Sequence, residues 1–291
     1  ANVEGIVADI IANVIAKGDR ALYDYAAQFD KVQLSALEVS AREIDEAFDS
    51  VEPEFLDVLR EAAANIRAFH EKQVRTSFII NETAGVVTGQ KITPIEKAGL
   101  YVPGGTASYP STVLMNAIPA KIAGVKEIIM VTPPLKDGTP NKDILVAAAV
   151  CGVDRIFMSG GAQAIAALAF GTETIPKVDK IVGPGNIFVA LAKKAVFGFV
   201  SIDSIAGPSE ILVLADETAN PHYVAADLLS QAEHDEMASA ILITTSEKLA
   251  NEVSEEIDKF LEKLSRKEIM QKSLDNYGYI LVANDMDDAI M

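Results

Sequence analysis

The sequence contains one cysteine, no tryptophan and three histidines among 291 residues. A single cysteine cannot form an internal disulfide, which is typical of a reducing compartment, so we expect a cytoplasmic location. Basic residues are also scarce, because 25 Lys and Arg stand against 42 Asp and Glu and leave a net charge of −17. This deficit argues against a nucleic-acid partner, since binding to a phosphate backbone requires a basic surface.

Long hydrophobic runs are missing as well. The apolar stretch 144–153 is far shorter than the ~20 residues that a membrane-spanning helix needs. We find no basic segment followed by an apolar run, so we expect neither membrane insertion nor secretion. The chain begins at Ala1 without a methionine and ends at Met291 inside an expected helix, which indicates a piece of a longer protein. Apolar residues are nevertheless abundant at 49%, enough to build a core.

The order of polar and apolar residues predicts an α/β fold. The first hundred residues are expected to be mainly helical, with apolar residues at helical spacing and a capping box at Ser40–Glu43. From Gly99 onward, short apolar strands alternate with helices, the pattern of a parallel sheet with crossover helices. Strands are predicted at 99–102, 127–132, 155–158, 180–182, 210–214, 240–244 and 279–282. The helices between them are predicted at 111–123, 142–151, 162–170, 187–196, 221–233 and 246–264.

Three glycine-bearing loops follow predicted strands and precede helices: Tyr101–Gly105, Ser159–Gln163 and Gly183–Asn186. Open parallel sheets bind ligands at the carboxyl ends of their strands, where backbone amides and helix dipoles can receive a pyrophosphate. None is the Gly-x-Gly-x-x-Gly fingerprint, because Phe188 occupies the third glycine position. A tight turn is the better explanation of any one loop, but three such loops together favour a nucleotide site.

Few polar residues stand out as possible ligands of a metal or a substrate. Gln231 lies three residues before His234 at the end of a predicted helix, so both side chains can converge on one point. A Gln and a His alone are a weak zinc signal, and a capped, solvated helix end explains them as well. Ser209 offers a hydroxyl in a Gly-Pro-Ser turn that is also ordinary turn chemistry. Cys151 ends an apolar helix and is expected to be buried rather than nucleophilic.

Longer motifs resemble the histidinol dehydrogenase family and occur in that family's order. They are Tyr101-Val-Pro-Gly-Gly-Thr, Pro110-Ser-Thr-Val-Leu-Met-Asn-Ala-Ile-Pro, Gly160-Gly-Ala-Gln-Ala-Ile-Ala-Ala-Leu-Ala-Phe-Gly-Thr-Glu, Val178-Asp-Lys-Ile-Val-Gly-Pro-Gly-Asn, Ala206-Gly-Pro-Ser-Glu and Asp227-Leu-Leu-Ser-Gln-Ala-Glu-His. The resemblance covers nearly the whole chain and is weakest before residue 90.

This resemblance implies a zinc-dependent enzyme that oxidises L-histidinol through L-histidinaldehyde to L-histidine, with two NAD per substrate. It implies a homodimer whose fold pairs two incomplete Rossmann-like domains. We therefore expect an N-terminal helical segment at 1–99, an NAD-binding domain at 100–209 and a second, zinc-binding domain at 210–291. By matched motif position, NAD contacts are expected from Tyr101, Gln163 and Asn186. Substrate contacts are expected from Ser209, Gln231 and His234, the last two also binding zinc.

The resemblance also has a departure. Family members continue into a Pro-Glu-His segment whose Glu and His do the acid–base work, and then supply an Asp and a partner-subunit His to zinc. These residues are expected beyond Met291, so no catalytic residue is assigned and the chain is expected to be inactive alone. Two alternatives stay open. One is a relative that oxidises another primary alcohol, such as sulfopropanediol, and the other is a non-catalytic nucleotide-binding module.

Overall fold

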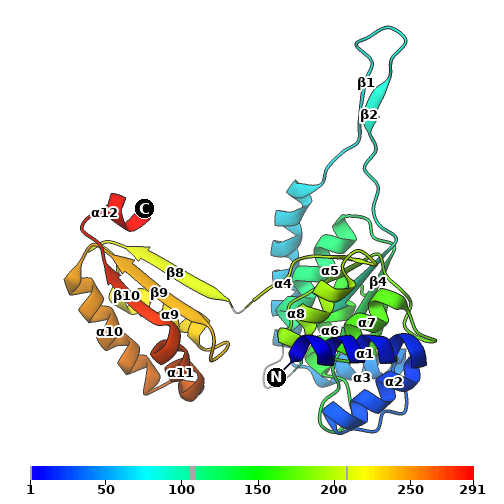
Figure 1. Ribbon diagram of the computed structural model, residues 1–291, viewed down its shortest axis with the longest axis horizontal. Helices are drawn as coiled ribbons and strands as arrows, with labels where there is room; N and C mark the ends of the chain where they lie inside the picture. The colour runs from blue at the N-terminus through cyan, green and yellow to red at the C-terminus, as the bar shows by residue number, and fades with distance from the viewer. Residues whose placement is uncertain (1, 105–108, 208) are drawn as a thin grey trace. The chain divides into compact units, whose positions relative to one another are not determined.

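The computed structural model describes residues 2–104, 109–207 and 209–291 and divides into two compact units (Figure 1). Unit 1 is Ala1–Ile205 and unit 2 is Ala206–Met291. Gly105 of the first predicted loop and Pro208 of the Gly-Pro-Ser turn lie outside the described residues. In the part of the chain that is described, no helix combines the length and the apolar character that crossing a membrane requires.

Unit 1 holds the N-terminal helices and the larger sheet. Its helices are α1 (Val3–Lys17), α2 (Asp19–Tyr25), α3 (Ala41–Ser50), α4 (Pro53–His70), α5 (Pro110–Ile122), α6 (Lys142–Cys151), α7 (Gly161–Phe170) and α8 (Ile187–Val196), with short π-helical and 3-10 turns at Ala26–Asp30 and Glu71–Gln73. Its strands are β1 (Phe78–Ile80), β2 (Thr88–Gln90), β3 (Lys97–Tyr101), β4 (Glu127–Thr132), β5 (Arg155–Met158), β6 (Lys180–Val182) and β7 (Ser201–Ile202).

The larger sheet of unit 1 has the strand order β5-β4-β3-β6-β7, and every neighbouring pair is parallel. Strands β4 and β5 are therefore added on one side of β3, and the chain then returns to add β6 and β7 on the other side. This is the order of a doubly wound nucleotide-binding sheet, with the reversal between β3 and β6. The predicted α/β class with parallel sheets and crossover helices is confirmed.

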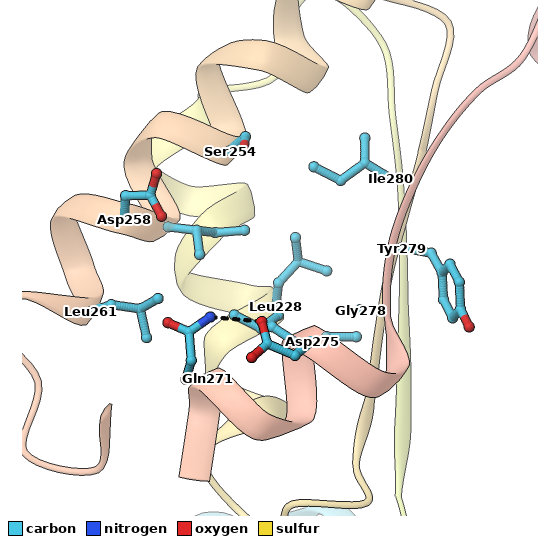
Figure 2. Close-up of a pocket in the computed structure, with 12 residues that line it drawn as sticks. Leu228, Ser254, Asp258, Leu261, Gln271, Asp275, Gly278, Tyr279 and Ile280 are labelled. Atoms are coloured by element: carbon cyan, nitrogen blue, oxygen red, sulfur yellow. Dashed lines mark hydrogen bonds between the residues drawn. The ribbon is translucent and has the colours of Figure 1, made fainter. Parts of the chain in front are cut away.

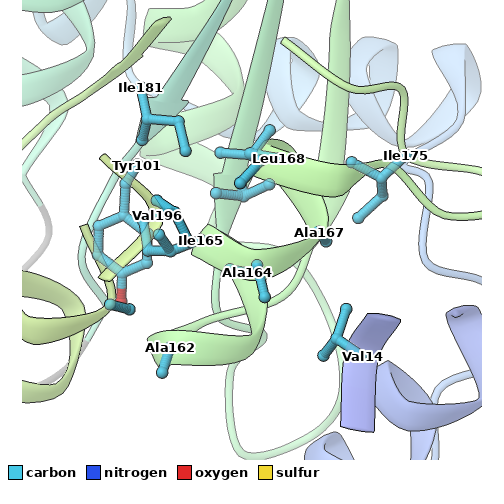
Figure 3. Packing of buried hydrophobic residues seen from close by; sticks show 14 of the residues in the cluster. Val14, Tyr101, Ala162, Ala164, Ile165, Ala167, Leu168, Ile175, Ile181 and Val196 are labelled. Atoms are coloured by element: carbon cyan, nitrogen blue, oxygen red, sulfur yellow. The ribbon is translucent and has the colours of Figure 1, made fainter. Parts of the chain in front are cut away.

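Helices cover both faces of this sheet, and the strands are apolar on both faces as a result. Ile128 and Met130 of β4 join the cluster under α5 and α6, whereas Ile129 and Val131 join the cluster under α1, α7 and α8. Figure 3 shows part of the second cluster. Alternate residues of a strand point to opposite faces, so a strand buried on both sides becomes a continuous apolar run.

The first hundred residues are mainly helical, as expected, but they also contain a β-hairpin that the sequence did not predict. β1 and β2 form an antiparallel hairpin that extends away from the rest of unit 1 (Figure 1). Phe78, Ile79 and Ile80 are 45–76% exposed, so the strand carries no alternation of buried and exposed residues. Such alternation is the main signal for a strand in a sequence, and the hairpin lacks it.

The exposed edge of β5 is covered by the segment that precedes α3. Val39 donates its backbone N–H to Ile156, and Leu37 accepts one from Met158, so a short antiparallel bridge closes the edge. Glu38 adds an ion pair, in which Arg155 donates two hydrogen bonds of 2.7 Å to its carboxylate. Covering an edge in this way prevents pairing with another chain.

Unit 2 is a smaller layer of helices on a parallel sheet. Its elements are β8 (Glu210–Ala215), α9 (Pro221–Ala232), β9 (Ser239–Thr244), α10 (Glu247–Leu261), α11 (Lys267–Tyr277), β10 (Gly278–Val282) and α12 (Met286–Ile290). The strand order is β10-β9-β8, without a reversal. Ile211, Val213 and Leu242 lie on one face of the sheet and pack with residues of α9, α10 and α11.

We expect Glu38→Gln to lower the stability of the protein at neutral pH and much less in acid. The hydrogen bonds and charge of Arg155 lower the pKa of Glu38 below its ordinary value of 4.5. A carboxylate with a lowered folded pKa contributes stability above its unfolded pKa and loses it as the pH falls through the folded pKa. Urea unfolding at several pH values should show the gap to wild type closing below pH 4.5.

The matched control is Glu46→Gln, because Glu46 pairs with Arg42 on the exposed surface of α3. Surface ion pairs contribute little, so this variant should follow wild type at every pH. A Glu38→Gln gap that stays constant from neutral to acid pH would contradict our assignment.

Candidate functional site

The candidate site lies where the strand order reverses, at the carboxyl ends of β3 and β6. These strands pair in parallel with Leu100 opposite Val182, so the next residues, Tyr101 at the end of β3 and Gly183 just after β6, lie side by side. Two of the three predicted glycine loops thus begin at adjacent positions. Open α/β sheets bind ligands in the crevice at this reversal.

Gly183 is the tightest point of the arrangement. Its φ is +119°, and a Cβ built on it would collide with the backbone carbonyl of Tyr101. Both the left-handed backbone and the missing space exclude larger residues. The glycine therefore allows the chain to leave β6 directly over the end of β3.

Tyr101 also contacts the remaining glycine loop, Ser159–Gln163. Its side chain is 4% exposed, and its hydroxyl accepts a 3.0 Å hydrogen bond from the backbone N–H of Gly161, the first residue of α7. Burial raises the pKa of the Tyr101 hydroxyl, and the Gly161 hydrogen bond offsets part of that rise. Figure 3 shows Tyr101 beside α7. The first amide of α7 is thus already occupied by a protein group.

The other two predicted NAD-contacting residues differ in exposure. Gln163 is buried on α7 at 4% exposure, and its Oε1 lies 2.8 Å from where a Cβ of Gly161 would stand. Asn186 is exposed and caps α8, because its Oδ1 accepts hydrogen bonds from Phe188 (3.1 Å) and Val189 (3.2 Å). Asn186 therefore has a structural role that sequence reasoning did not assign to it.

Lys193 and Asp203 are polar residues at this edge that sequence reasoning missed. Lys193 is 3% exposed, pairs with Asp203 and donates a 2.9 Å hydrogen bond to the carbonyl of Gly183. The signal was present in the sequence, because Lys193 stands between Val189 and Val196 at the spacing of the buried stripe of α8. A lysine on a core stripe is rarely buried without a partner.

The predicted substrate and zinc residues all belong to unit 2. Ser209 precedes β8 and is exposed, and its carbonyl accepts a 3.3 Å hydrogen bond from Ser239 at the start of β9. Gln231 lies in the last turn of α9, and the exposed His234 follows, its N–H donating to the Gln231 carbonyl at 3.1 Å. The structure thus places these residues at the end of the second sheet where strands β8 and β9 begin.

The donor set at this end of the sheet fits part of a zinc site. The His234 imidazole is a strong zinc ligand and the Gln231 amide oxygen a weaker one, so two of the usual four positions are available. Among the described residues, no group of three or more His, Cys, Asp or Glu could hold a metal ion. Cys151 does not contribute, because it is buried in unit 1 and burial raises the pKa of its thiol to about 11.

A separate hollow of about 210 Å³ lies in unit 2 between α9, α10, α11 and β10 (Figure 2). Its floor is apolar, and at its rim the Gln271 amide donates a 2.8 Å hydrogen bond to Asp275. It shares no residue with the predicted site, so we do not assign the nucleotide or the substrate to it.

Comparison with protein families gives a match to the histidinol dehydrogenase model over residues 1–291. The histidinol dehydrogenase of Clostridium acetobutylicum is 58% identical over 281 residues, which cover 97% of this chain and 65% of the relative. The histidinol dehydrogenase of Geobacillus kaustophilus is 57% identical over 284 residues, which cover 98% of this chain and 67% of the relative. The chain therefore spans about two thirds of the length of these relatives.

Solved structures agree. A crystal structure of histidinol dehydrogenase from Elizabethkingia anophelis matches with a TM-score of 0.95 and 43% identity, covering 100% of this chain and 67% of that one. An NAD-dependent benzaldehyde dehydrogenase from Corynebacterium glutamicum matches with a TM-score of 0.51 at 15% identity, over 99% of this chain and 75% of that one. The second likeness concerns the fold alone.

We expect Gly183→Ala to destabilise unit 1 more than Gly198→Ala. Both glycines have a positive φ, +119° and +102°, so an alanine is strained by about 1–3 kcal/mol at either position. Only at Gly183 would the added Cβ also collide with backbone, whereas nothing lies within 4 Å of it at Gly198. Urea unfolding of both variants measures the difference, and equal losses of stability would show that the chain at Gly183 can move away from Tyr101.

Proposed function

Because this chain belongs to the histidinol dehydrogenase family, we propose that the protein containing it oxidises L-histidinol through L-histidinaldehyde to L-histidine and reduces two NAD. The observation that carries this proposal is the family match over residues 1–291, with relatives near 58% identity. The doubly wound sheet of unit 1 supports it, since a strand reversal is where such sheets bind nucleotides.

We place the nucleotide at the ends of β3 and β6. Asn186 is exposed at the start of α8, where the positive end of the helix dipole favours a phosphate. Its Oδ1 is engaged in the helix cap, which leaves the Nδ2 group to donate to a ligand. The buried Tyr101 and Gln163 contribute by shaping the floor of this edge. NAD bound there would supply the hydride acceptor.

We place the substrate and zinc at the end of the second sheet where strands β8 and β9 begin. Gln231 and His234 supply two zinc donors there, and Ser209 supplies a hydroxyl for a polar group of the substrate. A zinc ion held by these residues would supply a template that orients the substrate more than it activates it. The remaining ligands and the acid–base pair are expected from parts of the family sequence that do not align with these residues.

Three further assignments are proposals of the same kind. Residues 1–99 form the helical support, 100–209 the NAD-binding domain and 210–291 the domain that carries zinc ligands. The homodimer and the cytoplasmic location remain predictions from the family resemblance and the single cysteine. No feature of the described residues favours a second function.

The proposed function predicts the stoichiometry of the reaction. The full-length protein that contains this chain should form two NADH for each L-histidinol consumed, because the aldehyde is oxidised in a second step. Spectrophotometry of NADH with chromatography of histidine measures both products. Faster oxidation of sulfopropanediol than of L-histidinol would point to another alcohol dehydrogenase of the family. NAD binding without oxidation of either alcohol would point to a nucleotide-binding module.

The placement of NAD predicts different effects for two substitutions of Asn186. Asn186→Ser keeps a helix-capping oxygen, whereas Asn186→Ala removes it and should cost about 1 kcal/mol of stability. Both lose the Nδ2 donor, so both should weaken NAD binding by roughly 3- to 10-fold, the value of one hydrogen bond. Calorimetric titration and thermal unfolding of the 291-residue chain separate the two effects. NAD affinity in Asn186→Ser equal to wild type would refute the contact.

A further inference from the structure

Lys193 is an unusual residue for its position. It faces the core of unit 1 from α8, between Val189 and Val196, and is only 3% exposed. Burying an ammonium group has a large desolvation cost, and its attraction to one carboxylate rarely yields net stability. An apolar side chain of similar length would pack there at least as well. A role beyond packing must therefore be found in what Lys193 contacts.

The contacts of Lys193 converge on one glycine. Its Nζ donates to the Gly183 carbonyl at 2.9 Å and pairs with Oδ1 of Asp203. Oδ2 of Asp203 accepts the Gly183 N–H at 2.8 Å, and Oδ1 accepts the N–H of Ser204 at 2.7 Å. One ion pair thus engages both backbone polar groups of Gly183. It also joins α8 to the residues that follow β6 and β7.

Fixing Gly183 fixes the direction in which the next residues leave the sheet. Asn186 takes up the N–H groups of Phe188 and Val189, the second and third of α8. The backbone N–H groups of Gly185 and Asn186 have no hydrogen-bond acceptor within the described parts of the chain. These two donors therefore precede the positive end of α8, on a loop whose starting residue is held from both sides.

We propose that Lys193 and Asp203 are positioning residues that hold the Gly183–Asn186 loop in the shape that receives the diphosphate of NAD. This inference rests on the nucleotide placement proposed above. Neither charge needs to touch the ligand, because the lysine is neutralised by Asp203 and covered by the core. The pair acts through Gly183, and the neutral backbone amides of the loop contact the phosphate.

The test uses the 291-residue chain with Lys193→Met, Asp203→Asn and the double variant. Methionine keeps the length and the packing of lysine but cannot donate to Gly183. Asparagine keeps the size of aspartate and can still accept the Gly183 N–H, so it covers the case in which Lys193→Met fails to fold. The control is Lys194→Met, because Lys194 is 57% exposed and pairs only loosely with Glu4 at 3.4 Å.

Two measurements are made on each variant. Amide hydrogen exchange of residues 183–189 reports on the loop without any ligand, and calorimetric titration reports the affinity for NAD. We expect both single substitutions to speed exchange in this segment and to weaken NAD binding at least tenfold. The double variant should be no weaker than the worse single one, because residues that act as one unit are not additive. Lys194→Met should match wild type in both measurements.

Unchanged exchange at 183–189 in folded Lys193→Met and Asp203→Asn would overturn the inference whether or not NAD binds. Faster exchange with undiminished NAD affinity would overturn it too, since the pair would then be only structural. If wild type itself binds no NAD, the nucleotide placement fails and this inference fails with it. The exchange data would then separately show whether the ion pair holds the loop.

Discussion

The parallel pairing of β3 with β6 is the contact on which the rest of unit 1 depends. β3 pairs with β4 on one side and with β6 on the other, so the chain must cross back over the sheet after β5. Crossover connections are right-handed, and a reversal of direction therefore moves the helices from one face to the other. The two hydrophobic clusters, one on each face, are consequences of that single reversal.

The same reversal brings core and candidate site to one place. Where two neighbouring strands diverge, their chains must separate, and the only room beside the Tyr101 carbonyl is that of a glycine. The buried hydroxyl of Tyr101 then fixes the start of α7, while Lys193 and Asp203 fix the start of the Gly183–Asn186 loop. In the proposed nucleotide site, stability and ligand binding would be coupled, and mutations there must be judged on both.

All seven strands that the sequence predicted are present with bounds within two residues, whereas the short strands β1, β2 and β7 were not predicted. β4, β5 and β6 have the expected bounds, because their apolar runs end at polar or glycine residues. β1 and β2 were missed because each is only three residues long: Phe78–Ile80 has no alternation of polar and apolar residues, and Thr88–Gln90 has no apolar side chain. Strand order also could not be read, since it depends on which pairings bury the most surface rather than on local pattern.

The candidate site was predictable only in part, for a similar reason. Glycine loops at the carboxyl ends of strands follow a general rule of α/β sheets, and the loops after β3 and β6 obey it. Ser209 and His234 do not, because they lie where β8 and β9 begin. The spacing of His234 from Gln231 and the turn at Ser209 were weak signals, and the family motifs were needed to assign these residues. Lys193 was overlooked because a lysine is normally read as a surface residue, although its spacing with Val189 and Val196 placed it inside.

The acidic composition of the chain bears on how an anion can bind to it. With a net charge of −17, the average field of the protein repels a dinucleotide. The lysine nearest the Gly183–Asn186 loop cannot compensate, because Asp203 neutralises it and the core covers it. In the proposed nucleotide site the attraction comes from neutral amides at the start of α8, and it is confined to the first turn and needs a fixed geometry. In the proposed site, a loop that binds phosphate through backbone amides must be rigid, and the ion pair of the buried Lys193 with Asp203 at its first glycine would provide that rigidity.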